Sequence, residues 1–151
     1  MEDPPHRCPA EVRELDDLPS IETNSRQIHT VLYGKNINDY LFIDESVLIS
    51  TNSGLFFFED EEQLINNRRP KFIKYTEASG LSQDFINVLI PQNNDKVWIS
   101  TTDGISSLDI GAKRAVSYKH VLNAADRNFN HNAGYMTSDS MLYFGSSTGV
   151  L

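Results

Sequence analysis

The chain has a single cysteine, Cys8, among 151 residues, so no disulfide can form within it. Small secreted folds held together by several disulfides are therefore excluded. No stretch approaches the roughly 18 consecutive apolar residues that a membrane-spanning helix needs. Residues 1–6 also lack the basic and then apolar order of a secretory signal. We expect neither a signal peptide nor a membrane contact within this sequence.

Basic residues are few. Lys and Arg number 13 against 21 Asp and Glu, which gives a formal net charge of −8. Proteins that bind nucleic acid carry clustered positive charge, so nucleic acid is excluded as a partner. The densest charged run, Glu59–Glu62, is acidic. We expect it to form a solvated loop.

No pattern of catalytic or metal-binding residues is present. The four histidines do not pair with other ligands at metal-binding spacing. Gly145–Gly149 matches G-x-S-x-G, but a nucleophile elbow needs a helix after it and a later acid and histidine. Asp84, Asp103 and Asp126 are not placed as a carboxylate pair by any motif. The sequence predicts no catalytic residue, no metal site and no cofactor, although a pair assembled from different loops stays open.

One motif is written three times, as Val47–Leu55, Val97–Ile105 and Leu142–Val150. Three apolar residues lead, small or hydroxylated residues follow, and then come a glycine and an aliphatic residue. The glycines are separated by 104 − 54 = 50 and 149 − 104 = 45 residues. Self-similarity at a period of roughly 20–50 residues is the signature of a repeat architecture. The predicted structural turns of the repeats are Gly54, Gly104 and Gly149.

Each copy predicts a hairpin, because an apolar strand is followed by a turn at glycine and, in the first two copies, by a second apolar run. A further strand precedes each hairpin, and Lys71–Tyr75 is a candidate for a weaker fourth strand. Four strands at this period fit a propeller blade. We predict an all-β fold of about three blades in an incomplete propeller over residues 28–151, with repeats near 36–60, 84–109 and 129–151. A β-sandwich with similar hairpins is the open alternative.

The first residues of the chain lack the repeat pattern, whereas the last residues lie within a repeat. Residues 1–27 contain Pro, Glu and Asp with little periodicity, and we expect a flexible lead-in. The third repeat stops at Val150 and Leu151, where the other copies continue into a strand. Three blades do not close a ring of the usual 4–8. We therefore expect either the remaining blades of a longer propeller or self-association as partners.

Aromatic residues offer no specific ligand site. Trp98 occupies the motif position of Leu48 and Tyr143, and we predict that all three take part in blade packing. A sugar-stacking role for Trp98 is the open alternative. Exposed aromatics expected on loops between blades are further candidate ligand contacts: Tyr75, Tyr118 and Phe129. The ligand-binding residues remain unspecified by the sequence.

Lys96–Asp109 resembles the repeat of two-component regulator propellers, which reads in outline G-x-L-W-I-G-T-x-x-G-L, then two residues, a hydrophobic residue and Asp. Tyr75–Ile86 resembles the segment between such repeats. Ser50 and Ser100 stand where the family usually has glycine. The resemblance implies the extracytoplasmic, periplasmic sensor of a hybrid histidine kinase, with oligosaccharides as the usual cues. The family's β-sandwich, membrane helix and kinase are not in this chain.

Three functions stay open. The first is a non-catalytic sensor whose blades bind a ligand, expected to be an oligosaccharide, and transmit to a signalling partner. The second is a fragment of a propeller polysaccharide lyase or glycoside hydrolase. The third is a protein-interaction scaffold that is indifferent to glycans. Glycan binding without product formation favours the first.

Overall fold

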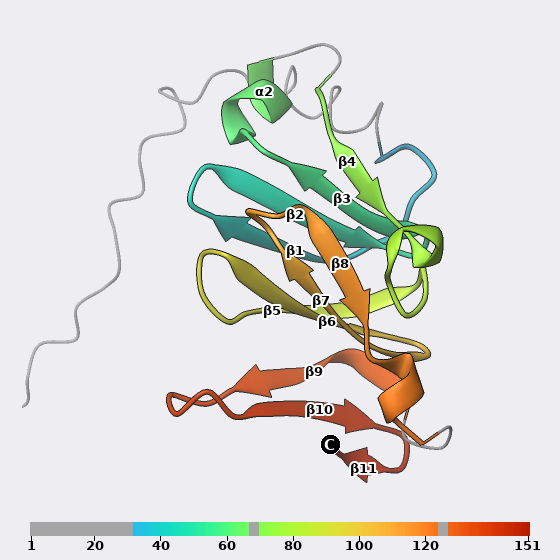
Figure 1. The fold of residues 1–151 in the computed structure, drawn as a ribbon. Coiled ribbons are helices and arrows are strands. Elements are labelled where there is room, and N and C mark those ends of the chain that lie inside the picture. The colour runs from blue at the N-terminus through green and yellow to red at the C-terminus, as the bar shows by residue number, and fades with distance from the viewer. Residues whose placement is uncertain (1–31, 67–69, 124–126) are drawn as a thin grey trace, which may run out of the picture.

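A computed structural model describes residues 32–66, 70–123 and 127–151, so the predicted lead-in 1–27 lies outside the described residues. The described strands form three antiparallel sheets, one after another along the chain (Figure 1). We call these sheets blades 1, 2 and 3. Their strands are β1 (Ile37–Ile43), β2 (Ser46–Thr51), β3 (Gly54–Phe58) and β4 (Ile73–Tyr75); β5 (Ile86–Pro91), β6 (Lys96–Thr101), β7 (Gly104–Asp109) and β8 (Arg114–Ser117); and β9 (Phe129–Met136), β10 (Leu142–Ser146) and β11 (Gly149–Val150).

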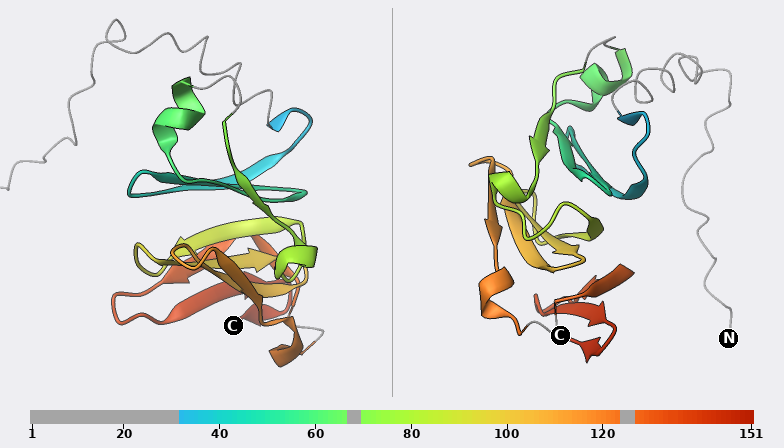
Figure 2. Two further views of the ribbon diagram at one scale, coloured as in Figure 1. Left: turned by 45° about the horizontal axis from the view of Figure 1, so that its top comes forward. Right: turned by 90° about the vertical axis from the view of Figure 1, so that its right-hand side faces the viewer.

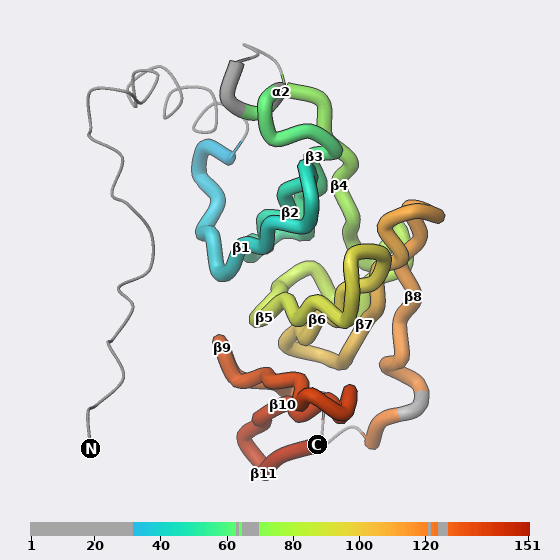
Figure 3. Tube along the Cα trace, turned by 90° about the vertical axis from the view of Figure 1, so that its left-hand side faces the viewer, coloured from blue at the N-terminus to red at the C-terminus, as the bar shows by residue number. Residues whose placement is uncertain are grey.

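The blades are stacked face to face as three layers (Figure 2). The first strands of the blades, β1, β5 and β9, follow one another along one side of the stack, and β4 and β8 lie on the other side (Figure 3). We call β1, β5 and β9 the inner strands. The all-β fold of about three repeats in an incomplete propeller is confirmed, and the described strands close no barrel.

The central strand of each repeat turns alternate residues toward opposite neighbours, as a pleated strand must. In β2, Leu48 packs toward blade 2, whereas Val47 and Ile49 pack on the opposite face. The core between blades 1 and 2 joins residues of both sheets, among them Leu48, Leu55, Phe57, Ile86, Val97 and Ile99. A second core joins blades 2 and 3 through Val88, Ile90, Ile105, Phe129 and Phe144. We call each such interface a seam.

The acidic run 59–62 is predicted from the sequence to be a loop, and this prediction is wrong for its second half. Helix α2 (Glu61–Asn66) begins there and lies against blade 1 (Figures 1 and 2). The Asp60 carboxylate accepts a hydrogen bond from the Glu62 N–H at 2.8 Å, and Leu64 is buried with Phe56 and Phe58. Acidic residues are favourable in the first turn of a helix, so the same charges that suggest a loop suit this helix start.

The outer strands are the weaker ones. The candidate strand Lys71–Tyr75 is present in a shorter form as β4. Blade 2 has its equivalent in β8, and blade 3 has three described strands. Within the described ranges, we find no helix with the length and apolar character needed to cross a membrane.

Candidate functional site

Each of the three predicted glycines ends a turn of the same kind, which a side-chain hydroxyl stabilises. Thr51, Thr101 and Ser146 each stand three residues before the glycine and donate to its carbonyl, at 2.8, 2.9 and 3.1 Å. The same hydroxyls accept the N–H of the residue just before the glycine. Gly54, Gly104 and Gly149 have φ of 120°, 122° and 144°. These values are accessible to glycine and strained for other residues, which is why the turns need it.

Two of these glycines also hold the chain that enters the next blade. The N–H of Gly54 donates to the carbonyl of Asp84 at 2.8 Å, and that of Gly104 to the carbonyl of Arg127 at 2.8 Å. Asp84 and Arg127 each stand two residues before an inner strand. One end of the stack therefore gathers the glycine turns and the entry segments of the inner strands. We call this end the turn rim.

An asparagine clamps each described seam. The Asn38 amide donates to the carbonyl of Ile86 at 2.7 Å, and the Asn87 amide donates to the carbonyl of Phe129 at 2.6 Å. In both cases the donor is the second residue of one inner strand and the acceptor is the first residue of the next. Asn130 is the equivalent residue of β9. The signal is in the sequence as Ile-Asn, Ile-Asn and Phe-Asn before each motif, but sequence reasoning predicts no role for it.

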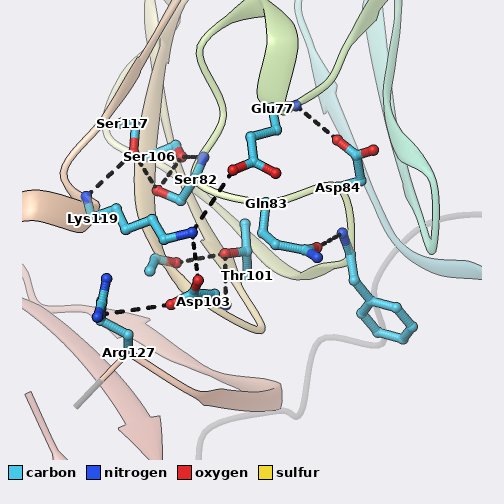
Figure 4. Close-up of polar contacts among 12 residues, drawn as sticks. Glu77, Ser82, Gln83, Asp84, Thr101, Asp103, Ser106, Ser117, Lys119 and Arg127 are labelled. Atoms are coloured by element: carbon cyan, nitrogen blue, oxygen red, sulfur yellow. Dashed lines mark hydrogen bonds and ion pairs between the residues drawn. The ribbon is translucent and has the colours of Figure 1, made fainter. Parts of the chain in front are cut away.

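A serine cluster fixes the segment that leads from blade 1 to blade 2 (Figure 4). The Ser82 hydroxyl donates to the carbonyl of Ile105 at 2.6 Å and lies 3.0 and 2.9 Å from the hydroxyls of Ser106 and Ser117. Its backbone N–H donates to Ser106 at 2.8 Å. Ser82 and Ser106 are buried, so these bonds satisfy groups that water cannot reach.

A charged cluster lies beside the serines on the turn rim (Figure 4). Asp103 forms ion pairs with the Lys119 ammonium at 2.5 Å and with Nε of Arg127 at 3.6 Å. Lys119 also lies 3.8 Å from Glu77. All four groups are partly exposed, so the pairs add little stability. They do hold two cations and two carboxylates within reach of a ligand in solution.

An enlarged bulge brings an aromatic pair to the same rim. In blades 1 and 2 the inner strand has one extra residue at its bulge. In β9, Phe129 opposes Ser146 and Gly134 opposes Phe144. Between these two pairs β9 advances by five residues and β10 by only two, so the bulge of β9 holds three extra residues. The ring of His131, in this bulge, meets Phe85 edge-on at 5.4 Å. Asn132 has a φ of 53°, and bulges of this kind often redirect side chains near binding sites.

An apolar pocket of about 280 Å³ opens between blades 2 and 3. Its walls include Trp98, Tyr118 and Leu122 from the blade 2 side and Leu142 and Phe144 from blade 3. The Trp98 indole N–H donates to the Gln92 side chain at 2.9 Å, and its ring lies 5.4 Å from that of Tyr118. The pocket walls are almost wholly apolar, and the Trp98 N–H is already bonded to Gln92, so the walls offer little to orient a polar ligand.

The three residues predicted for blade packing lie at one repeat position in different settings. Leu48 is fully buried in the first seam, and Trp98 packs partly buried against the second core. Tyr143 is 43% exposed on the far face of blade 3. All three point to the side of the following blade. That Leu48, Trp98 and Tyr143 share a role in blade packing stays a prediction.

Two of the three aromatics expected to be exposed are buried. Tyr75 is 3% exposed within β4, and Phe129 is 2% exposed at the start of β9. The physical reason is that both belong to strands that face a seam and not to loops. Tyr118 is partly buried and lines the apolar pocket. Tyr75 and Phe129 are therefore unsuited as ligand contacts.

Tyr75 has a buried hydroxyl without a hydrogen-bond partner among the described residues. Burial raises the pKa of its phenol above the ordinary value of 10.0, and the charge of Glu59 raises it further. The folded chain therefore holds this proton more tightly than the unfolded chain. The contribution of this phenol to the free energy of unfolding is fully present below about pH 10. It is lost as the pH rises through the folded-state pKa.

We expect Tyr75→Phe to leave stability unchanged or to raise it by about 1 kcal/mol, because it removes an unsatisfied buried hydroxyl without changing the ring. The variant should also lose less stability than the wild type between about pH 9 and 11. Urea unfolding across that pH range measures both effects. A clear destabilisation at pH 7 would show that the hydroxyl has a partner.

The acids singled out from the sequence are engaged in local contacts. Asp84 accepts the N–H of Glu77 at 2.7 Å, and Asp103 is ion-paired as described above. Asp126 lies outside the described residues. Among the described residues, no group of three or more His, Cys, Asp and Glu side chains is placed to hold a metal ion.

No protein-family model and no curated protein matches the sequence. Solved structures do match in fold. One is the extracellular domain assigned to the hybrid two-component system BT3049 from B. thetaiotaomicron, with a TM-score of 0.62 and 23% identity. Another is the extracellular domain assigned to the hybrid two-component system BT4673 from the same organism, with a TM-score of 0.60 and 23% identity.

The chain spans only a small part of these structures. The match to BT3049 covers 76% of this chain and 15% of that chain, and the match to BT4673 covers 73% and 15%. Such a likeness establishes the fold. The chain is thus a stretch of stacked β-blades of the kind found in these extracellular domains.

Proposed function

We propose that the chain is a ligand-binding, non-catalytic part of an extracytoplasmic sensor in a two-component signalling protein, and that it binds an oligosaccharide at the turn rim. The observation that carries the proposal is the arrangement between blades 2 and 3. There, the bulge of β9 sets His131 against Phe85, and the segment that enters β9 carries Arg127, which pairs with Asp103 of the glycine turn, as Lys119 also does.

The chemistry of this surface suits a sugar. The C–H faces of a pyranose ring pack on aromatic rings, and its hydroxyls both donate and accept hydrogen bonds. Phe85 and His131 supply rings, while the carboxylates and cations nearby supply acceptors and donors. Loops held on a rigid scaffold are also where binding residues concentrate. The likeness in fold to extracellular domains of two-component systems supports the placement of the chain in a sensor.

The proposal is tested by isothermal titration of the chain with a panel of neutral and acidic oligosaccharides, with mass spectrometry of the sugar afterwards. We expect binding of at least one sugar without a change in its mass. His131→Ala should weaken this binding roughly tenfold, which corresponds to the loss of one good contact.

Lys113→Ala is the matched control. Lys113 is also exposed, but it lies in the turn between β7 and β8, at the end of blade 2 opposite the turn rim. Its ammonium forms an ion pair with Glu59. It should leave binding unchanged. Cleavage of the sugar would support a lyase or hydrolase instead, and binding of a protein but of no glycan would support a scaffold.

A further inference from the structure

The residue just before each turn glycine differs in charge among the three repeats. It is Ser53 in blade 1, Asp103 in blade 2 and Thr148 in blade 3. The residue whose carbonyl accepts the glycine N–H changes with it, from Asp84 after blade 1 to Arg127 after blade 2. The repeat with a carboxylate in its glycine turn is thus followed by a cation. The seam between blades 2 and 3 therefore carries matched opposite charges at the turn rim.

Asp103 pairs with two cations at once (Figure 4). Its Oδ2 lies 2.5 Å from Nζ of Lys119, and its Oδ1 lies 3.6 Å from Nε of Arg127. The hydroxyl of Thr101 accepts the Asp103 N–H at 3.2 Å, which holds the backbone of Asp103 in the turn. Each of the two cations therefore has a counter-charge in place that belongs to the fold itself.

The guanidinium of Arg127 shows why this counter-charge matters. Its Nε is buried and has no hydrogen-bond partner among the described residues. The Asp103 carboxylate supplies the opposite charge, at ion-pair distance. A cation that is partly removed from water attracts an anion strongly when no such partner neutralises it. Asp103 thus occupies the place that an anionic group of a ligand would otherwise take.

Two further carboxylates lie beside this group. Glu77 lies 3.8 Å from Nζ of Lys119, and Asp84 accepts the Glu77 N–H at 2.7 Å. Together with Asp103 these acids outnumber Lys119 and Arg127, and the whole chain has a formal net charge of −8. An anionic ligand therefore approaches a surface with an excess of negative charge, which Coulomb repulsion opposes.

We propose that Asp103 is a specificity-determining residue of the turn rim: it neutralises Lys119 and Arg127, so that the rim excludes anions and the oligosaccharide bound there is an uncharged one. The choice of sugar rests on the proposed function, whereas the exclusion of anions follows from the ion pairs alone. An uncharged sugar needs no counter-ion, because its hydroxyls accept from ammonium groups and donate to carboxylates that remain paired. A uronate or a sulfated sugar would have to compete with Asp103 for both cations.

Asp103→Asn tests the exclusion of anions without any sugar. The substitution keeps the shape of the side chain and removes the counter-charge that Lys119 and Arg127 share. Inorganic sulfate is titrated alone at about pH 8, where ordinary imidazoles are neutral, and circular dichroism checks the fold. We expect the variant to bind sulfate at least about tenfold more tightly than the wild type does. Unchanged sulfate binding would overturn the proposal.

Asp95→Asn is the matched control. Asp95 is an exposed acid in the turn between β5 and β6, at the end of blade 2 opposite the turn rim, so the same charge is removed far from the cations. Sulfate binding should stay at the wild-type level. Adding Lys119→Gln to Asp103→Asn should remove most of the gain. An equal gain from Asp95→Asn would assign the effect to net charge and contradict the role of Asp103.

The wild-type chain tests the choice of sugar with two matched pairs. One pair is tetragalacturonate and its methyl ester, and the other is cellotetraose and its C6-oxidised form. We expect the uncharged member to bind at least about tenfold more tightly, and Asp103→Asn to narrow the difference. An acidic member that binds the wild type as tightly as its uncharged partner overturns the proposal. If no sugar binds while Asp103→Asn gains sulfate, the oligosaccharide function fails and the exclusion of anions by Asp103 stands.

Discussion

Gly54→Ala should destabilise the folded chain by about 3–5 kcal/mol. A Cβ at Gly54 would lie 2.5 Å from the carbonyl oxygen of Tyr75, which is backbone and has little freedom to move. The φ of 120° adds strain that an alanine cannot relieve without breaking the turn. Urea unfolding followed by circular dichroism measures the loss.

The chain offers two matched controls for this substitution. Gly149 is the same residue of the third repeat and has a φ of 144°, but a Cβ added there would have no atom within 4 Å. Gly149→Ala should therefore cost at most about 1–2 kcal/mol, from backbone strain alone. Gly111 has no positive φ and only an ordinary contact at 3.7 Å, so Gly111→Ala should be nearly neutral. Similar losses at Gly54 and Gly149 would refute the steric account of the first turn.

Leu48→Ala should cost about 2–5 kcal/mol, as is usual for a large residue removed from a packed core. Leu48 is fully buried in the seam between blades 1 and 2, where its neighbours come from both sheets. The cavity cannot be filled without moving one blade against the other. Thermal or urea unfolding measures this cost.

Tyr143→Ala tests the same repeat position where the seam is open. Because Tyr143 is 43% exposed, the substitution should change stability by no more than about 0.5–1 kcal/mol when measured at a concentration where the chain is monomeric. A cost equal to that of Leu48→Ala would mean that the Tyr143 side chain is packed as tightly as that of Leu48, against its exposure in the structure.

The repeated motif predicts the blades because it combines two local signals that tertiary contacts do not override. Buried apolar triplets such as Val97–Ile99 favour a strand, and the φ of the turn requires glycine. The same reasoning misses helix α2, since Glu61 and Glu62 suggest solvated charge while Leu64 packs on blade 1. A short helix held by one buried contact leaves little periodicity to detect.

Most of the candidate site could not be predicted from the sequence. His131 and Phe85 are 46 residues apart in the chain (131 − 85), and only the β9 bulge brings their rings together. The clamps of Asn38 and Asn87 act across blades, so their role depends on a stacking that no single repeat contains. The glycine turns are predictable because each turn is local, whereas the partners of Gly54 and Gly104 lie in the segments that enter the next blade.

The most direct test of the proposed sensor role is hydrogen–deuterium exchange of the chain with and without the sugar that binds it, with the sugar recovered and weighed by mass spectrometry. We predict slower exchange confined to the turn rim, at residues 101–104 and 127–134, together with an unchanged sugar. Protection elsewhere, no protection at any concentration, or a cleaved sugar would contradict a non-catalytic binding site at this rim.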